Sequence, residues 1–270
     1  MIKIPREQTE FVTGEGILGF PALFPGQAVD SQTPGSKSYK LEWSGDIQPN
    51  EPIVKAVSTV AQAHDPANWQ HYVFGPVGRL RKLEEMAATI PGSGKGRDIS
   101  KYPYAAGKYV LGFSKTISLK FLKMEGVDLS DGAKRSLYNA AIDANAPPVR
   151  KYCNTTNPFD VQQVEAMNLD RRSKGQPAIP ESDYYKTLIP VRPDEIWAGC
   201  IVRVLGRAFW SQTPRGKEVL LGLESVLLVR QGERLVGEVS PDRAFGAFAP
   251  PSELAPPPPP PAGFSLSNLL

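Results

Sequence analysis

The chain has 270 residues, of which 41% are hydrophobic and 22% charged, and its formal net charge is +3. This composition is typical of a folded protein with one sizeable core, and it excludes a chain that is disordered throughout. The N-terminal residues lack the apolar stretch of a signal peptide, and glycine and charged residues interrupt the longest apolar runs, so we predict no membrane span.

Cysteine and histidine are too few for a structural zinc site. His64 and His71 are far in sequence from Cys153 and Cys200, so four ligands at the usual spacings cannot be assembled. We expect two thiols in a reducing compartment, with a single disulfide as the alternative. The sequence predicts neither a bound metal nor a cofactor.

The first clear strand covers residues 38–43. Alternation places Tyr39, Leu41 and Trp43 on one of its faces. Apolar residues at helical spacing then predict a helix over 52–63.

The following stretch, 64–128, is rich in glycine, proline and tyrosine, and it indicates long loops with short strands. A second helix is predicted over 130–144. Ser130 and Asp131 are its candidate N-terminal caps, and the pair Pro147 and Pro148 follows its end.

Two apolar runs near the C-terminus predict a long hairpin. The first covers 200–210, the second covers 218–230, and a loop over 211–217 connects them. A further turn is expected at 231–234. Alternation in the first run gives one face with Ile201, Arg203, Leu205, Arg207 and Phe209, and another with Val202, Val204, Ala208 and Trp210.

Residues 251–270 form a tail of different composition. The uninterrupted prolines at 256–261 favour a stiff, extended polyproline II spacer. An apolar tip without side-chain charge follows, which indicates either a docking peptide or a frayed terminus. The apolar residues of the tip are Phe264, Leu266, Leu269 and Leu270.

Motifs of hydrolytic enzymes are missing from the sequence. The segment 91–96 resembles a phosphate-binding loop, but its first glycine is misplaced, and glycine rather than Ser or Thr follows Lys95. There is no Gly-x-Ser-x-Gly elbow, and the carboxylates are scattered. A metal-dependent nuclease stays open, because metal ligands can converge from distant positions.

The distribution of charge is more informative than its total. Between Arg79 and Lys123 there are ten basic residues and three acidic ones, with tyrosine and phenylalanine interleaved. Residues 201–217 hold four basic residues and no acid. Cations beside aromatic rings suit an unpaired nucleic-acid strand, which offers phosphates and the flat faces of its bases. The alternative is a solvated sheet face with tyrosines at the edges of the core.

Several of these segments resemble a family of bacteriophage OB-fold single-stranded DNA-binding proteins. The resemblance covers roughly 18–63 and 184–248. The segments that carry it are 20–24, 38–43, 52–63, 195–204, 207–210, 222–235 and 245–246. One departure concerns the tail: many such proteins end in an acidic tail, whereas Glu253 is the only acid after Asp242 here.

The resemblance implies a mainly β, α+β protein. Residues 1–250 would form a five-stranded OB-fold barrel with helical and loop insertions at about 64–183, followed by a disordered, Pro-rich tail. It implies a non-enzymatic protein of the bacterial host cytoplasm that coats and protects single-stranded DNA, without sequence preference, in phage replication, recombination and repair. Because the tail here is not acidic, we expect its Pro-spaced hydrophobic peptide to replace the acidic tail in recruiting replication or recombination proteins. Besides the nuclease, a phage structural or assembly protein is the other alternative.

The predicted DNA-binding residues are cations that contact phosphates and rings that stack on bases. The cations on the barrel are Lys37, Lys40, Arg203, Arg207, Arg215 and Lys217. Lys95 and Arg97 belong to a basic loop that would clamp the strand from outside. The stacking candidates are Tyr39, Trp43 and Phe209.

Overall fold

The computed structural model describes residues 2–31, 35–74, 78–87, 102–213 and 216–235. Several predicted site residues lie outside these ranges, namely Lys95, Arg97 and Arg215 and the tail residues Phe264, Leu266, Leu269 and Leu270. In the described part of the chain, helices and strands mix, and nine strands form one sheet.

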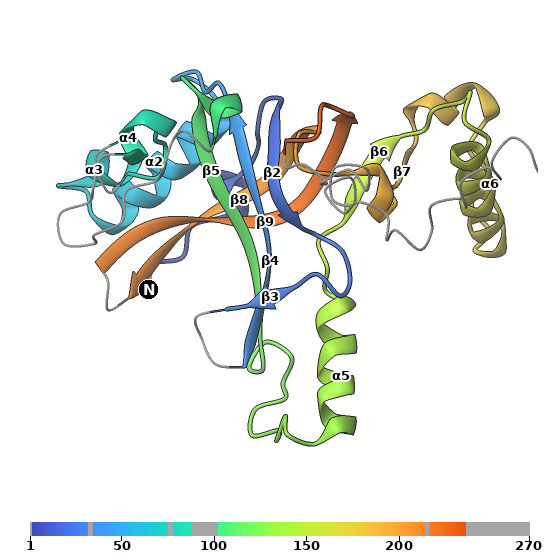
Figure 1. Ribbon diagram of the computed structural model, residues 1–270, viewed down its shortest axis with the longest axis horizontal. Coiled ribbons are helices and arrows are strands. Elements are labelled where there is room, and N and C mark those ends of the chain that lie inside the picture. The colour runs from blue at the N-terminus through green and yellow to red at the C-terminus, as the bar shows by residue number, and fades with distance from the viewer. Residues whose placement is uncertain (1, 32–34, 75–77, 88–101, 214–215, 236–270) are drawn as a thin grey trace, which may run out of the picture. The chain divides into compact units, whose positions relative to one another are not determined.

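Five strands of this sheet pair in a closed ring (Figure 1). They are β2 (Gly16–Ala22), β4 (Ser36–Gly45), β5 (Tyr109–Ser118), β8 (Ile201–Thr213) and β9 (Gly216–Arg230). β2 pairs with β4, β4 with β5, β5 with β9, β9 with β8, and β8 again with β2. Only the contact between β5 and β9 is parallel, and the other four are antiparallel.

The remaining strands extend the ring at its margins. β1 (Glu10–Val12) pairs with β8, and β3 (Val29–Asp30) pairs with β4. β6 (Val149–Tyr152) continues along the edge of β9 beyond β5, and β7 (Leu188–Pro190) pairs with β6.

One face of the ring strands forms the core. Tyr39, Leu41 and Trp43 of β4 are all buried, as are Leu111 and Phe113 opposite them on β5. The alternation predicted for the C-terminal hairpin is confirmed: Val202, Val204 and Ala208 are buried, whereas Arg203 and Phe209 are exposed.

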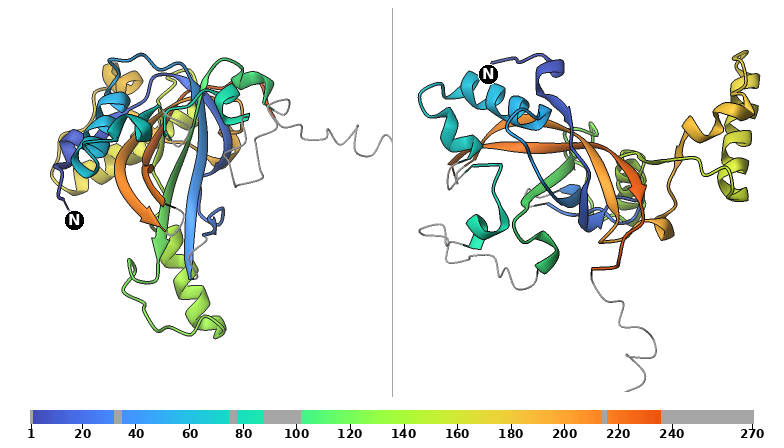
Figure 2. Two further views of the ribbon diagram at one scale, coloured as in Figure 1. Left: turned by 90° about the vertical axis from the view of Figure 1, so that its left-hand side faces the viewer. Right: turned by 90° about the horizontal axis from the view of Figure 1, so that it is seen from above.

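Both predicted helices are present. α2 (Pro52–His64) buries an apolar stripe and lies alongside β8 (Figure 2). α5 (Gly132–Asp143) begins after Asp131, whose carboxylate accepts hydrogen bonds from the backbone N–H groups of Ala133 and Lys134. The cap predicted at this position is confirmed, and it satisfies N–H groups that have no partner within the helix.

Among the other helices, α6 is long and the rest are short. They are α1 (Arg6–Thr9), α3 (Trp69–Val73), α4 (Leu83–Ala87), α6 (Pro158–Ser173), and the 3-10 turns η2 (Pro103–Ala105), η3 (Glu181–Lys186) and η4 (Pro193–Glu195).

Two expectations about loops are wrong. The stretch 64–128 contains β5, a ten-residue strand that pairs with β4 along its whole length. The loop expected at 211–217 is shorter, because β8 continues to Thr213 and β9 begins at Gly216. Cross-strand pairing between Ser211 and Glu218 and between Gln212 and Lys217 extends the hairpin through these polar residues.

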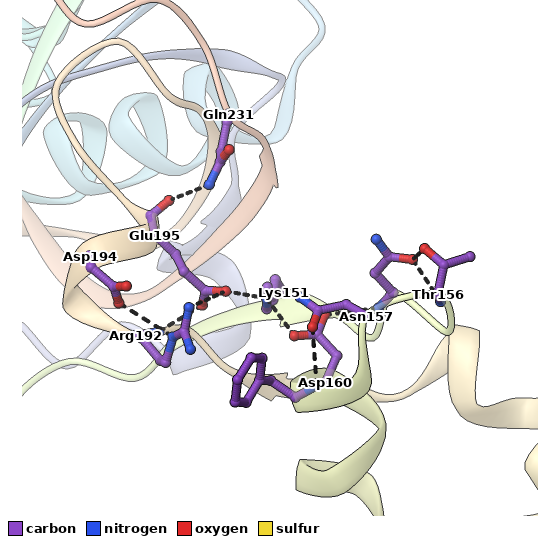
Figure 3. Close-up of polar contacts among 10 residues, drawn as sticks. Lys151, Thr156, Asn157, Asp160, Arg192, Asp194, Glu195 and Gln231 are labelled. Atoms are coloured by element: carbon purple, nitrogen blue, oxygen red, sulfur yellow. Dashed lines mark hydrogen bonds and ion pairs between the residues drawn. The ribbon is translucent and has the colours of Figure 1, made fainter.

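A buried ionic cluster joins β6 to α6 and η4 (Figure 3). The Lys151 ammonium lies 2.8 Å from Asp160 Oδ1 and 2.6 Å from Glu195 Oε1, and all three side chains are largely buried. Burial acts to lower the pKa of Lys151, but the hydrogen bonds to Asp160 and Glu195 outweigh it, so the pKa is raised. Removing only one partner of such a cluster is costly, because it leaves a buried charge without its counter-charge.

Candidate functional site

A row of four residues crosses the exposed face of the ring. Lys40 on β4 pairs with Ser114 on β5, Ser114 with Gly222 on β9, and Gly222 with Arg207 on β8. Residues directly opposite each other on neighbouring strands point to the same face of a sheet. The chain neighbours of these residues, such as Leu41, point into the core. We call Lys40, Ser114, Gly222 and Arg207 the cross-strand row.

The centre of the cross-strand row carries almost no side chain. Gly222 and Ser114 occupy it, and Gly112 lies two residues further along β5 on the same face. Glycine within a strand often marks a place where another chain or a ligand approaches the backbone closely. A cation stands at each end of this low floor, the Lys40 ammonium at one end and the Arg207 guanidinium at the other.

An aromatic ring lies next to the floor. Phe209, two residues beyond Arg207, is 37% exposed. A methyl group placed on Gly222 would meet the Phe209 ring at 3.5 Å, so the ring stands directly beside the glycine. The predicted neighbourhood of Arg207 and Phe209 on one exposed face is therefore present.

More rings lie near the far margin, beside Glu42 of β4. Phe20 is 51% exposed and meets Tyr102 edge-on at 5.9 Å between ring centres, and Tyr102 meets Tyr104 at 6.1 Å. The Tyr104 hydroxyl donates to Glu42 at 3.5 Å. Glu42 points to the same face as Lys40, so these rings flank the cross-strand row. The sequence analysis included the two tyrosines only as part of a basic and aromatic segment. It included Phe20 only as part of the segment 20–24 and did not predict it as a site residue.

Arg79 covers Gly112. Its guanidinium donates to the Gly112 carbonyl, and a methyl group on this glycine would meet it at 3.6 Å. Burial lowers the pKa of Arg79, nearby Arg81 lowers it further, and Glu218 opposes both effects. The Nε atom is buried and has no hydrogen-bond partner among the described residues. The basic segment beginning at Arg79 thus contributes a cation to this surface.

Carboxylates from distant segments pair with the arginines of β8. Arg203 lies 3.1 Å from Glu15, and Arg207 Nε lies 3.8 Å from Glu224 Oε1. Glu224 also approaches Arg6, at 3.4 Å. The absence of acids between 201 and 217 in sequence therefore does not give an acid-free surface. The Arg203–Glu15 pair is exposed, so it contributes at most about 1 kcal/mol and can exchange for other partners. The pairs of Glu224 are half-buried, because its side chain is only 29% exposed and Arg207 Nε is buried.

Lys37 does not join the cross-strand row. It pairs with the buried Ile117 and so points to the other face of β4, where it lines a cavity of about 450 Å³ against α5. Arg135 and Tyr138 of α5 line the same cavity. Lys217 is exposed near the tip of the β8–β9 hairpin, where it pairs in register with Gln212.

The prediction that Tyr39 and Trp43 stack on bases is wrong. Both side chains are fully buried in the core. The Tyr39 hydroxyl donates to the Ile142 carbonyl at 3.2 Å and to Asp143 Oδ1 at 3.1 Å, and burial raises its pKa. Alternation correctly placed the two rings on one face of β4, but that face is the inner one.

The described residues hold no group of three or more His, Cys, Asp and Glu side chains that could bind a metal ion. Cys153 and Cys200 are both buried free thiols, and burial raises the pKa of Cys153. Within the same ranges, no helix has the length and apolar character needed to cross a lipid bilayer.

No protein-family model matches the chain, and no curated protein matches it. Among solved structures, it is similar to the single-stranded DNA-binding protein from bacteriophage Enc34 in complex with ssDNA. The identity is 11% and the TM-score 0.43, over 87% of this chain and 96% of that one. It is also similar to gp2.5, a single-stranded DNA-binding protein encoded by bacteriophage T7, with 14% identity and a TM-score of 0.37 over 90% and 96% of the two chains.

Proposed function

We propose that this protein binds single-stranded DNA without sequence preference, on the exposed face of an OB-fold barrel. The closed ring of β2, β4, β5, β9 and β8 supports the barrel, because five strands paired in this way form a small closed sheet. OB-folds bind oligonucleotides on the face of their second and third strands. In this ring those strands are β4 and β5, which carry Lys40, Gly112 and Ser114.

The observation that carries the proposal is the cross-strand row itself. Its floor of Ser114 and Gly222 lets an extended chain lie against the sheet, with Lys40 at one end and Arg207 at the other. Rings stand beside it, Phe209 near Gly222 and Phe20 with Tyr102 beyond β4. A single strand has phosphates for the cations and exposed base faces for the rings.

These groups favour unpaired over paired DNA. In a duplex the faces of the bases are stacked inside the helix, so Phe209 and Phe20 could not stack on them. The cations and rings of this surface would bind any sequence, because every base has a flat face and every nucleotide has a phosphate. The ion pair of Arg203 is exposed, so a phosphate can replace Glu15 at little cost. Glu224 is half-buried beside Arg207, so a phosphate at Arg207 has to compete with this carboxylate.

A protein of this kind acts by coating its strand, and the proposed role is to protect single strands during phage DNA replication, recombination and repair. Binding of this type requires no catalysis.

The test is a titration of the full chain with fluorescent oligo-dT and with a duplex of the same length, over a range of salt concentrations. We expect tight binding of the single strand, much weaker binding of the duplex, and a log–log salt slope of about −0.7 for each phosphate neutralised. Equal affinity for both forms would refute the proposal. Cleavage of the labelled strand in the presence of magnesium or manganese would point to a nuclease instead.

The same titration on two charge-reversal variants locates the surface. Lys40→Glu changes an exposed cation of the cross-strand row, and Lys55→Glu changes an exposed cation on α2. Lys40→Glu should weaken oligo-dT binding and reduce the magnitude of the salt slope, whereas Lys55→Glu should leave both nearly unchanged. Equal effects of the two variants would show that binding depends on net charge alone.

A further inference from the structure

A pocket of about 330 Å³ opens at the edge of β8, next to the cross-strand row. The N-terminal segment with Ile4 and Arg6, α2 with Val60, and β8 with Ala208 and Phe209 line it. Val60 and Ala208 are each only 1% exposed, so they form an apolar floor belonging to the core. We call this cavity the β8-edge pocket. Its volume lies in the range of small-ligand pockets.

The wall of the β8-edge pocket is an aromatic ring fixed in position. The Trp210 ring stacks on His64 at 5.1 Å between centres with 4° between the ring planes, and Tyr72 meets it edge-on at 4.9 Å. The Tyr72 hydroxyl is in turn bound to Asp65 at 2.9 Å. Because these neighbours hold the indole in place, a flat ligand entering the pocket does not have to order it first.

The rim of the pocket is cationic. Lys3, Arg6 and Arg207 all line it. Arg6 and Arg207 share the carboxylate of Glu224, and the Arg6 side chain, which is 56% exposed, also donates to Glu10 at 2.9 Å. Two guanidinium groups directed at one carboxylate can bind a phosphate in its place, since they offer several N–H donors in planar arrays.

We infer that the β8-edge pocket takes one nucleobase of the bound strand, with the phosphate of that nucleotide held at the rim by Arg6 and Arg207. The inference rests on the proposed function and adds a defined site to it. Arg207 and Phe209 line the pocket, and they also belong to or stand beside the cross-strand row, so the two sites are neighbours. Val60 and Ala208 on the floor offer no side-chain hydrogen bond, the Thr9 hydroxyl in the lining already donates to the Arg6 carbonyl, and His64 stacks on Trp210. We therefore expect the pocket to accept different bases.

The experiment measures binding of three small probes to the full chain by ligand-observed NMR and tryptophan fluorescence. The probes are thymidine 5′-monophosphate, thymidine, and deoxyribose 5-phosphate. We expect the monophosphate to bind best and thymidine to bind more weakly, with both quenching tryptophan fluorescence. If deoxyribose 5-phosphate binds as well as the monophosphate, the site is only an anion site, and the inference is wrong. Absence of binding by all three would also overturn it.

Two variants assign the binding to the pocket. Ile4→Phe fills the pocket, and its matched control is Leu169→Phe, at a 66% exposed position on α6 that does not line it. Ile4→Phe should weaken binding of the monophosphate about tenfold or more, as expected for the loss of one stacked base, and Leu169→Phe should not. Arg6→Gln tests the rim without changing the floor: it should weaken binding of the monophosphate and leave thymidine binding unchanged. If all variants bind the monophosphate equally well, its binding site lies outside the β8-edge pocket.

The results separate this inference from the proposed function. If oligo-dT binds and the monophosphate does not, the β8-edge pocket is not a base site, but the proposed function stands. If the monophosphate binds and oligo-dT does not, the proposed function fails.

Discussion

Glu224 holds Arg207 at the margin of the cross-strand row, with 3.8 Å between Glu224 Oε1 and Arg207 Nε. The second oxygen of the same carboxylate lies 3.4 Å from Arg6. Under the proposed function, a phosphate that binds Arg207 must compete with Glu224, and we expect this carboxylate to limit the affinity for single-stranded DNA.

Glu224→Gln should raise the affinity for oligo-dT. It removes a negative charge close to the bound phosphate, and such a charge costs about 1 kcal/mol at 4 Å in water, or about fivefold in affinity. Stability should change by only about 1 kcal/mol, because Glu224 is half-buried and its arginine partners stay in reach of water. Fluorescence anisotropy at low salt measures the effect, and Glu165→Gln, at an exposed position on α6, is the control. Unchanged affinity would mean that the strand does not approach Arg207.

Sequence patterns predicted the parts of the fold whose periodicity is local. The C-terminal hairpin and its two faces followed from the alternation around Arg203 and Phe209. The two helices followed from helical spacing and, for α5, from Asp131 as a cap. In each case the residues that determine the element lie within it.

Features that depend on distant partners could not be predicted in this way. Gly112, Ser114 and Lys115 interrupt the apolar pattern of β5, which is defined mainly by its pairing with β4. The partner of Arg203, Glu15, comes from the opposite end of the chain. Alternation could not show whether the face with Trp43 points inward, because that depends on what packs against it.

Phe209→Ala should weaken binding of oligo-dT while leaving the fold intact. The loss expected for one stacked ring is about 1–3 kcal/mol of binding free energy. Because the side chain is 37% exposed, the melting temperature should fall little. Phe209→Tyr keeps a ring and is the control, with affinity near that of the native protein. Equal losses in both variants would argue against stacking at this position.

Ser114→Ile raises the floor of the cross-strand row. A β-branched side chain is well tolerated in a strand, so the protein should stay folded. The added bulk beside Gly222 should keep a nucleotide away from the sheet and weaken oligo-dT binding several-fold. Titration together with a thermal melt tests both statements. If the variant keeps both the oligo-dT affinity and the melting temperature of the native protein, the DNA does not cross β5 at Ser114.

Gly16→Ala should destabilise the protein through Trp43. A methyl group at Gly16 would come within 2.3 Å of the indole ring and 2.8 Å of the Ser44 carbonyl, so the buried ring would have to move. Overpacking of this kind typically costs about 1–3 kcal/mol of the free energy of unfolding. Gly14→Ala is the matched control, because no atom lies within 4 Å of a methyl group there. Urea unfolding measures both. A neutral Gly16→Ala would contradict the packing of Trp43.

Lys151→Met should be strongly destabilising, because it leaves Asp160 and Glu195 buried without their cation. Removing one partner of a buried ionic group costs about 3–5 kcal/mol. Lys174→Met removes an exposed pair with Asp170 at 2.7 Å and should cost less than about 1 kcal/mol. Since the pKa of Lys151 is raised, its contribution is complete below the ordinary lysine pKa and is lost only as pH rises through the folded-state value. Similar unfolding curves for the two variants would disprove the role of the cluster.

The ring of strands also constrains how the chain can be made. β2, β4 and β5 leave the ribosome before the β8–β9 hairpin, and a sheet that they formed by themselves would have two open edges until this hairpin is synthesised. Open strand edges pair readily with other chains, and late long-range closure slows folding. A product terminated before Ile201 should therefore aggregate rather than fold into a smaller version of the protein. Ribosomal stalling within the long segment before this hairpin would then give no folded product.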